Sequence, residues 1–266
     1  RTLYFECAMG AAGDMLMGAL YELCPEKARF LADMNSLLPG VRLEAEAVRR
    51  QGIAGTHMRV VVHGQEEGHD RHHEHHHHEH HSLADIEAMI DGFSLPQAVR
   101  ESARSTYGLI AQAESEAHGV DVGEVHFHEV GALDAVVDVT GVCYLLHLLS
   151  PEAVCASTVT VGSGTIHTAH GLLPVPAPAT ARLLAGVPVT AGDIEAEMCT
   201  PTGAALLRTF ARSFGPMPDG TVLGCGYGCG TKDFPQANCL RAFLLDTAEA
   251  SEGPNDRIVE LKANID

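Results

Sequence analysis

The first motif of the chain is Leu3-Tyr-Phe-Glu-Cys-Ala-Met-Gly-Ala-Ala-Gly-Asp-Met-Leu-Met-Gly-Ala-Leu-Tyr-Glu-Leu23. Its apolar start, Leu3–Phe5, predicts a strand, and the pair Gly10 and Gly13 predicts a tight turn. Residues 15–23 then carry apolar side chains with helical spacing. The motif therefore predicts a strand that leads through a glycine turn into a helix.

The rest of the chain mixes helical and strand patterns without an internal repeat. We expect an α/β or α+β fold, with one or more mixed sheets and flanking helices, interrupted by a disordered His-rich loop over residues 68–82. Further expected helices cover residues 26–37, 83–90, 97–118 (broken or frayed near Gly108), 133–149, 178–184 and 201–211. The expected strands cover 41–49, 56–63, 154–161, 222–227 and 239–245, and 162–178 is expected to be a long loop.

Composition excludes several classes of function. The chain has 266 residues, 17 Lys and Arg against 35 Asp and Glu, and a net charge of −18 with His neutral. So acidic a chain offers no basic surface for a nucleic-acid backbone. No apolar run is long enough to span a membrane. The eight cysteines are scattered through apolar segments, which favours reduced core thiols and hence the cytoplasm.

Histidines are concentrated in one tract. Nine of the thirteen residues from His69 to His81 are histidines. Neutral imidazole suits Ni²⁺, Zn²⁺ and Cu²⁺, so the tract predicts loose binding of several metal ions, against the alternatives of an affinity tag or a solvated loop. The expected ligands are His72, His73, His75, His76, His77, His78, His80 and His81.

A second constellation lies between residues 125 and 138. In an extended segment His126 and His128 share one face, and Asp134 and Asp138 share one face of the helix that follows. Together these four side chains predict either a mixed nitrogen and oxygen metal site or a pair for proton transfer. The alternative is a hydrogen-bond network that only holds the junction, and Asp138 needs a buried partner in every case.

Three glycine-rich segments are weaker candidates. His167 and His170 lie three residues apart in the 162–178 loop, whose glycines permit a ligand to approach the backbone. The turn Gly10-Ala-Ala-Gly13-Asp14 could hold a phosphate on its N–H groups, although a tight turn explains it equally well. Lys232, one of only three lysines, could meet a ligand phosphate or simply be an exposed hairpin residue.

Several of these stretches together resemble the LarC family of nickel insertion proteins, nearly from end to end and in order. The matching motifs are Leu3-Tyr-Phe-Glu-Cys7 with Gly10-Ala-Ala-Gly-Asp-Met15, the histidine tract, His126-Phe-His-Glu-Val-Gly-Ala-Leu-Asp-Ala-Val-Val-Asp138, His170-Gly-Leu-Leu-Pro-Val-Pro-Ala-Pro-Ala-Thr180, Thr200-Pro-Thr-Gly-Ala-Ala205 and Gly226-Tyr-Gly-Cys-Gly-Thr-Lys-Asp233.

The resemblance implies a cytoplasmic nickel insertion lyase, or cyclometallase. Such an enzyme inserts Ni²⁺ into pyridinium-3,5-bisthiocarboxylic acid mononucleotide in a CTP-dependent reaction, which matures the nickel-pincer cofactor of lactate racemase-type enzymes. It implies an insertion domain over residues 1–255 with the His-rich loop 68–82. Residues 256–266 then start a C-terminal nucleotide-binding domain outside this chain, and we expect that domain to bind CTP with a divalent metal.

The resemblance also suggests roles for the residues singled out above. Bonding of nickel to ring carbon C4 requires loss of its proton, and His126, His128 and Glu129 are the candidate bases. Gly10, Gly13, Asp14 and Lys232 are the candidates for binding the nucleotide. The expected partners are the small-molecule nucleotide, the apo form of a lactate racemase-type enzyme, and further copies of the chain in a homo-oligomer.

Two other functions remain open on the sequence. A non-catalytic His-rich nickel or zinc metallochaperone, or a storage protein, would bind metal in the tract alone. A metal-dependent phosphohydrolase would use the His and Asp cluster, although no hydrolase signature is present.

Overall fold

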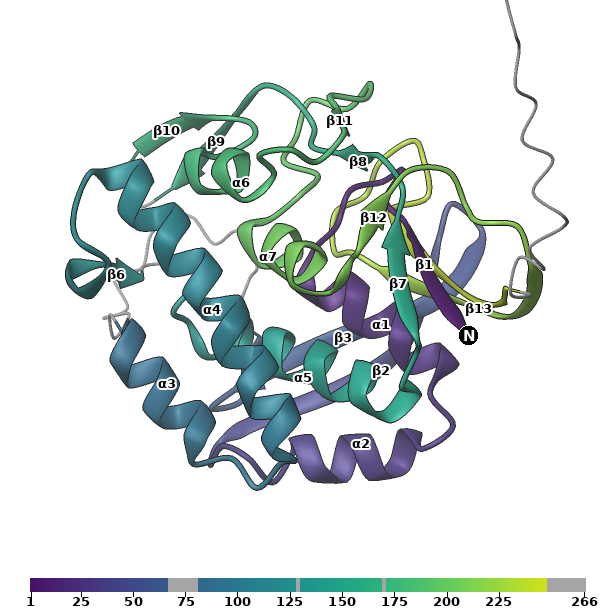
Figure 1. Cartoon of the computed structure of the whole chain (residues 1–266), viewed down its shortest axis with the longest axis horizontal. Helices are drawn as coiled ribbons and strands as arrows, with labels where there is room; N and C mark the ends of the chain where they lie inside the picture. Colours follow the sequence, from purple (N-terminus) through teal and green to yellow (C-terminus); the bar gives the residue numbers. More distant parts are fainter. Residues whose placement is uncertain (67–80, 128–129, 169–170, 248–266) are drawn as a thin grey trace, which may run out of the picture.

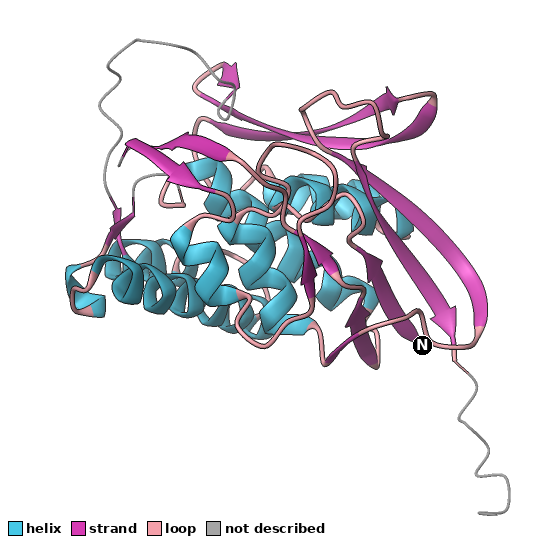
Figure 2. Cartoon of the chain, turned by 90° about the horizontal axis from the view of Figure 1, so that it is seen from above, coloured by secondary structure: helices cyan, strands magenta, loops and turns pink. Residues whose placement is uncertain are grey.

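The computed structural model describes residues 1–66, 81–127, 130–168 and 171–247. Its main element is a mixed sheet in the order β12-β7-β1-β14-β13-β3-β2, with β4 paired to β3. Helices pack against one side of the long strands (Figures 1 and 2). The α/β class expected from the sequence is confirmed. The strands of this sheet are β1 (Thr2–Glu6), β2 (Val41–Arg50), β3 (Ile53–Val62), β4 (Gln65–Glu66), β7 (Ala153–Ala156), β12 (Ser213–Phe214), β13 (Thr221–Cys229) and β14 (Cys239–Asp246).

Strand β1 lies inside the sheet, parallel to β7 and antiparallel to β14. Its residues Leu3, Tyr4 and Phe5 are all buried, as a strand covered on both faces requires. The chain then turns through Gly10, whose φ of +81° suits glycine, and enters helix α1 (Gly13–Leu23). Helix α1 packs on β13, β3 and β14, so the predicted strand, turn and helix form the centre of the fold.

The predicted pair of strands at 41–63 is a regular antiparallel hairpin. Its register runs from Val41 opposite Val62 to Arg50 opposite Ile53. The alternate residues Met58, Val60 and Val62 are buried, as the period of two predicts.

The helical layer contains α2 (Lys27–Met34), α3 (Leu83–Asp91), α4 (Gln97–His118), α5 (Leu133–Leu149), α6 (Pro178–Leu183), α7 (Pro201–Phe210) and the short 3₁₀ helix η1 (Val122–Glu124). Helix α5 has the predicted bounds. The predicted break in α4 near Gly108 is wrong: the helix is continuous. The buried face of α4, which includes Tyr107 and Ile110, offsets the cost of about 1 kcal/mol that a helical glycine brings.

Two other expectations need correction. The expected strand 154–161 is divided, because its second half, β8 (Val159–Thr160), leaves the main sheet and pairs with β11 (Val189–Thr190). The expected loop 162–178 contains a hairpin of β9 (Thr165–Thr168) and β10 (Gly171–Pro174). Backbone hydrogen bonding between β9 and β10 was not apparent from their glycine and proline content.

Helix α7 begins as its sequence predicts. The side chain of Thr200 caps it by accepting a hydrogen bond from the N–H of Gly203 at 3.2 Å, and Pro201 occupies the first turn. Within the described ranges, none of the helices has the length and apolar character needed to cross a membrane.

Candidate functional site

The turn between β1 and α1 brings α1 into direct contact with α5. A Cβ atom on Gly13 would lie 2.8 Å from both Cβ and Oδ2 of Asp138, so glycine is required for this approach. A Cβ atom on Gly10 would overlap the backbone carbonyl of Met198. Contacts within the chain thus account for both glycines, and phosphate binding at this turn stays a prediction.

Two carboxyl groups meet at the start of α1. Asp138 accepts a hydrogen bond from the backbone N–H of Asp14, while its Oδ1 is buried without a hydrogen-bond partner among the described residues. Burial, then the charge of Asp14, then that of Asp134 raise the pKa of Asp138 well above its usual value. The predicted buried partner of Asp138 is therefore the first turn of α1. This turn supplies a hydrogen bond to the carboxyl group but leaves its Oδ1 atom without one among the described residues.

His57, on β3, is the third group of this cluster. Its Nδ1 lies 3.7 Å from Oδ2 of Asp14 and 3.1 Å from the carbonyl oxygen of Cys229. Burial raises the pKa of the Asp14 carboxyl, and the nearby His57 and the N–H of Met15 oppose that rise. His57 is not among the site residues predicted from the sequence. Its only local signal is a histidine in an otherwise mostly apolar strand.

Tyr107 connects this cluster to the segment around residues 126–130. Its side chain is fully buried, its hydroxyl donates to the carbonyl of Val130 at 3.1 Å, and its ring lies 6.1 Å from that of Phe127. Burial, followed by the charges of Asp134 and Asp138, raises the pKa of Tyr107 well above its usual value. The structure therefore brings Asp134, Asp138 and this segment to the same region.

The end of the histidine tract pairs with the same segment. Strand β5 (His81–Ser82) is antiparallel to β6 (His126–Phe127), with Ser82 opposite His126 and His81 opposite Phe127. The Nδ1 atom of His81 is buried and has no hydrogen-bond partner in the described part of the chain. Of His126 the structure describes the backbone.

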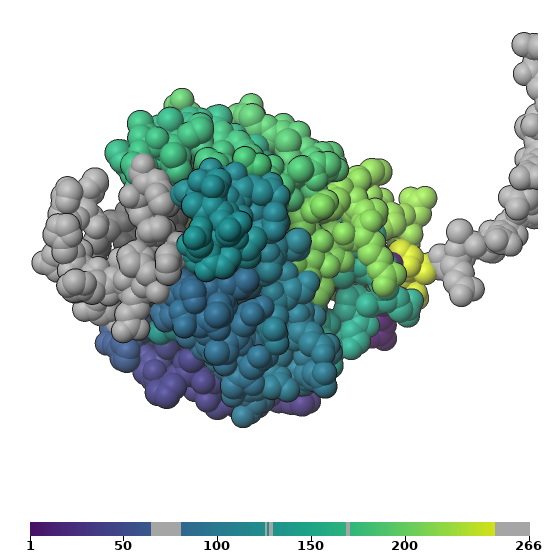
Figure 3. Space-filling model, turned by 60° about the vertical axis from the view of Figure 1, so that its left-hand side comes forward, coloured from purple at the N-terminus to yellow at the C-terminus, as the bar shows by residue number. Residues whose placement is uncertain are grey.

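The hairpin that carries His167 lies on the same side of the molecule as β6 (Figures 1 and 2). His167 is exposed on β9 and pairs with Leu172 of β10. The surface of α4 adjoins the region of this hairpin (Figure 3). No described contact joins His167 to the carboxyl cluster, so its role as a ligand stays a prediction.

Lys232 lies in the turn between β13 and β14. Its side chain is exposed, and its backbone carbonyl accepts a hydrogen bond from Asn238 at 2.8 Å. Arg50 anchors the start of this turn by donating to the carbonyl of Gly230 at 3.0 Å. Since His57 contacts the preceding carbonyl, that of Cys229, the turn with Lys232 begins beside the carboxyl cluster.

Several predicted site residues lie outside the described part of the chain. Among the residues that are described, no group of three or more His, Cys, Asp or Glu side chains is placed to hold a metal ion. A metal site at the junction would thus need ligands beyond those described. The predicted residues outside the described ranges are His72, His73, His75, His76, His77, His78, His80, His128, Glu129 and His170.

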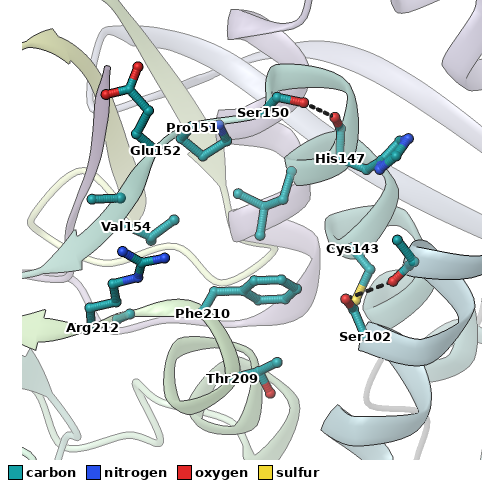
Figure 4. A pocket seen from close by; sticks show the side chains of 14 residues that line it. Ser102, Cys143, His147, Ser150, Pro151, Glu152, Val154, Thr209, Phe210 and Arg212 are labelled. Carbon is teal, nitrogen blue, oxygen red and sulfur yellow. Dashed lines mark hydrogen bonds between the residues drawn. The ribbon is translucent and has the colours of Figure 1, made fainter.

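A separate pocket of about 520 Å³ opens between α4, α5, α7 and β7 (Figure 4). Its walls include Ser102, Cys143, His147 and Arg212. His147 follows Asp138 by nine residues, or about 14 Å along the helix axis. This pocket therefore lies toward the opposite end of α5 from the carboxyl cluster.

Comparison with known proteins identifies relatives along the whole chain. A family model described as "Nickel insertion protein" matches residues 3–266. A "Putative nickel insertion protein" of Geotalea daltonii is 43% identical over 270 residues, covering 100% of this chain and 66% of the relative. The "Pyridinium-3,5-bisthiocarboxylic acid mononucleotide nickel insertion protein" of Desulfitobacterium hafniense is 40% identical over 271 residues, covering 100% of this chain and 64% of the relative.

The protein with the same name in Staphylococcus epidermidis is 38% identical over 248 residues, covering 93% of this chain and 60% of the relative. The chain thus spans about two thirds of the length of the curated relatives it matches. No solved structure matches it.

Proposed function

Because this chain belongs to the nickel insertion protein family, we propose that it inserts Ni²⁺ into pyridinium-3,5-bisthiocarboxylic acid mononucleotide. The family match supports the handling of nickel, and the names of two relatives supply the substrate. Nickel is here a substrate of the reaction. The CTP dependence, the lyase classification and a lactate racemase-type enzyme as recipient of the product belong to the same proposal.

The proposed reaction sets three requirements. Nickel must be held by few protein ligands, so that the two thiocarboxylate sulfurs of the substrate can displace them. The bond between nickel and ring carbon C4 forms as the C4–H bond breaks, and a base must take the proton. The single phosphate of the mononucleotide needs a cation or a set of N–H donors.

The observation that carries the proposal is the buried Asp138 carboxyl group, which accepts a hydrogen bond from the backbone N–H of Asp14 and is affected by the charge of the Asp14 side chain. Burial and the neighbouring negative charges raise the pKa of Asp138, so its carboxylate binds a proton more tightly than an ordinary one, as a general base requires. We therefore add Asp138 to His126, His128 and Glu129 as a candidate base and rank it first. Asp14 and His57 would determine the protonation state of Asp138.

The pairing of β5 with β6 supports a route for the metal. His81 ends the histidine tract and lies opposite Phe127 in the register, next to His126. We propose that the tract stores Ni²⁺ and passes it to a transfer site at His126 and His128, with Asp134 and His167 or His170 as further ligands.

The phosphate of the substrate is assigned to Lys232. Its turn is exposed and begins beside His57, and the chain has only three lysines to offer. No described residue is assigned to CTP. The proposal places the protein in the cytoplasm as a homo-oligomer, and its eight free cysteines are in keeping with a reducing compartment.

A single-turnover assay tests the proposal. The chain, extended by the C-terminal part that its longer relatives contain, is loaded with Ni²⁺ and mixed with the mononucleotide and CTP, and mass spectrometry follows gain of one nickel atom and loss of the C4 hydrogen. We expect Asp138→Asn to abolish product without changing the nickel content. Asp219→Asn, an exposed carboxylate in a distant turn, is the matched control. Insertion at the unchanged rate by Asp138→Asn would remove this residue from the mechanism.

A metallochaperone is the second candidate, because the histidine tract would suffice for carrying nickel. In that case nickel leaves the chain for an acceptor protein, and no nickel-containing nucleotide forms in the assay above. Product formation excludes the carrier as the whole function.

A further inference from the structure

Two thiols face each other at the closed end of the β13–β14 pair. Cys229 is the last residue of β13 and Cys239 the first of β14, and the register places them directly opposite one another. Their Sγ atoms are 3.0 Å apart. Both side chains are buried, Cys229 completely and Cys239 with 8% of its surface exposed.

The register at this position is compatible with a disulfide bridge. Directly opposed residues in an antiparallel pair have Cα atoms about 4.5 or 5.5 Å apart, depending on the hydrogen-bond pattern. A disulfide accepts Cα separations of about 4.4–6.8 Å. The sulfur atoms therefore have to approach by about 1 Å, which side-chain rotation can supply without moving the strands.

The third strand leaves room for the thiol pair. A Cβ atom on Gly55 of β3 would lie 2.6 Å from Sγ of Cys229, so a larger residue there would displace the sulfur. Cys225, on the same strand as Cys229, instead lies opposite Phe243 and has no thiol as its partner in the register. Cys225 therefore takes no part in this arrangement.

We propose that Cys229 and Cys239 are an oxidative modification site, at which a hydroperoxide converts the two thiols into a disulfide. The Sγ of Cys239, as thiolate, attacks one oxygen of hydrogen peroxide and the O–O bond breaks, which leaves a sulfenic acid. The departing hydroxide takes up the proton that the thiol released and becomes water. The Sγ of Cys229 then attacks this sulfur, the S–S bond forms and the S–OH oxygen leaves as a second water. The two sulfurs lose two electrons and the peroxide gains them.

The difference in pKa between the two thiols agrees with Cys239 reacting first. The hydrogen bond with Cys229 lowers the pKa of the Cys239 thiol and raises that of Cys229. Arg50 lowers the pKa of both thiols. Cys239 is also the more exposed of the two, so the better nucleophile is the one that a small oxidant reaches first.

The bridge would close the turn that contains Lys232. The segment from Gly230 to Asn238 would then be joined at its base by a covalent bond, in addition to the contact with Arg50. This inference does not rest on the proposed function, because the thiol pair and its test are independent of nickel.

Tryptic peptides test the proposal directly. Cleavage after Arg212, Lys232 and Arg241 puts Cys229 and Cys239 on two different peptides. The native chain is treated with graded hydrogen peroxide and then unfolded in the presence of excess N-ethylmaleimide, which blocks the remaining buried thiols as they become exposed, and the digest is analysed by mass spectrometry. We expect loss of two free thiols and a linked pair, 213–232 with 233–241, lighter than the separate peptides by two hydrogen atoms. Dithiothreitol should separate the pair.

Matched variants identify the sulfur involved, since peptide 213–232 also contains Cys225. The linked pair should persist in Cys225→Ser and be lost in Cys229→Ser. The proposal is overturned if the unmodified chain forms other disulfides or sulfonic acids before this pair, or if the link survives in Cys229→Ser. The first of these outcomes needs no variant, so a folding defect in a mutant leaves the test intact.

Discussion

Asp138 accepts a hydrogen bond from the backbone N–H of Asp14, so two acidic side chains meet where α1 begins. Gly13 makes this possible, because any side chain there would collide with Asp138. The contact concentrates negative charge at a buried position in the centre of the fold. Such an arrangement costs stability when both groups are ionised, and it is typical of functional sites.

The first prediction concerns stability and pH. The folded protein holds the pKa of Asp138 above its usual value of 3.8, so the native state binds the proton more tightly than the unfolded chain. Stability from this group is therefore fully present below pH 3.8 and is lost as the pH rises to the raised pKa. Asp138→Asn should remove this dependence, because the amide still accepts from Asp14 without ionising.

Urea unfolding at pH 4 and pH 8 measures the effect. We expect Asp138→Asn to match the unmodified chain at pH 4 and to exceed it at pH 8 by about 1.4 kcal/mol for each unit of raised pKa. Asp219→Asn should show no such difference. If Asp138→Asn is less stable than the unmodified chain at pH 8, the ionised carboxyl group of Asp138 does not cost stability and the prediction is contradicted.

The second prediction tests the close approach of α1 and α5. Gly13→Ala should destabilise the protein by about 1–3 kcal/mol, because the new methyl group forces the two helices apart. Gly108→Ala is the matched control, since Gly108 is in the interior of α4 with no atom within 4 Å of the added Cβ. It should stabilise the protein by about 0.5–1 kcal/mol. Chemical denaturation measures the free energy of unfolding of both variants. Changes of opposite sign would establish the contact between α1 and α5, whereas two stabilising changes would refute it.

The third prediction concerns His57. Its interaction lowers the pKa of Asp14, so His57→Gln should raise that pKa while the amide keeps a hydrogen bond to the carbonyl of Cys229. The titration of Asp14, followed by NMR of its carboxyl carbon, should move to higher pH. His63→Gln, an exposed residue just beyond the same strand, should leave it in place. Equal shifts of the Asp14 titration in both variants would show that the effect does not come from the contact between His57 and Asp14.

Local patterns in the sequence were enough to predict the main helices and the long strands. Helix α5 has an almost unbroken apolar sequence and the β2–β3 hairpin alternates, so each has a pattern that only one type of element satisfies. The division of residues 154–161 between two sheets was not predictable. Neither half carries a local signal that separates it from the other, and their partner strands lie thirty or more residues away.

The candidate site also contains residues that were predictable from the sequence and residues that were not. Asp134 and Asp138 were predictable from their spacing on one helix, because the helical repeat alone puts them on the same face. His57 was not, because its contact with Asp14 joins β3 to α1 and depends on how the sheet is assembled. The pairing of His81 with Phe127 likewise joins segments whose sequences give no sign of each other.

The fourth prediction concerns Lys232. If its ammonium group binds the phosphate of the mononucleotide, Lys232→Ala should raise KM by about tenfold, or about 1.4 kcal/mol, with little change in kcat. Lys27→Ala is the control of equal charge, since that ammonium lies over the ring of Tyr21, 5.3 Å from its centroid. Steady-state insertion assays at varied substrate concentration separate the two parameters. A fall in kcat alone would show that Lys232 does not serve the phosphate.

The fifth prediction separates nickel storage from nickel transfer. Calorimetric titration with Ni²⁺ should show that deletion of residues 69–81 removes most of the bound metal, because nine imidazoles are lost. One or two tight sites should survive in the folded body. Insertion should continue at saturating nickel after the deletion but cease in His126→Ala, whose position pairs with the end of the tract.

Loss of insertion at saturating nickel in the deletion variant would show that the tract itself takes part in transfer. Absence of any remaining nickel site would instead favour the metallochaperone.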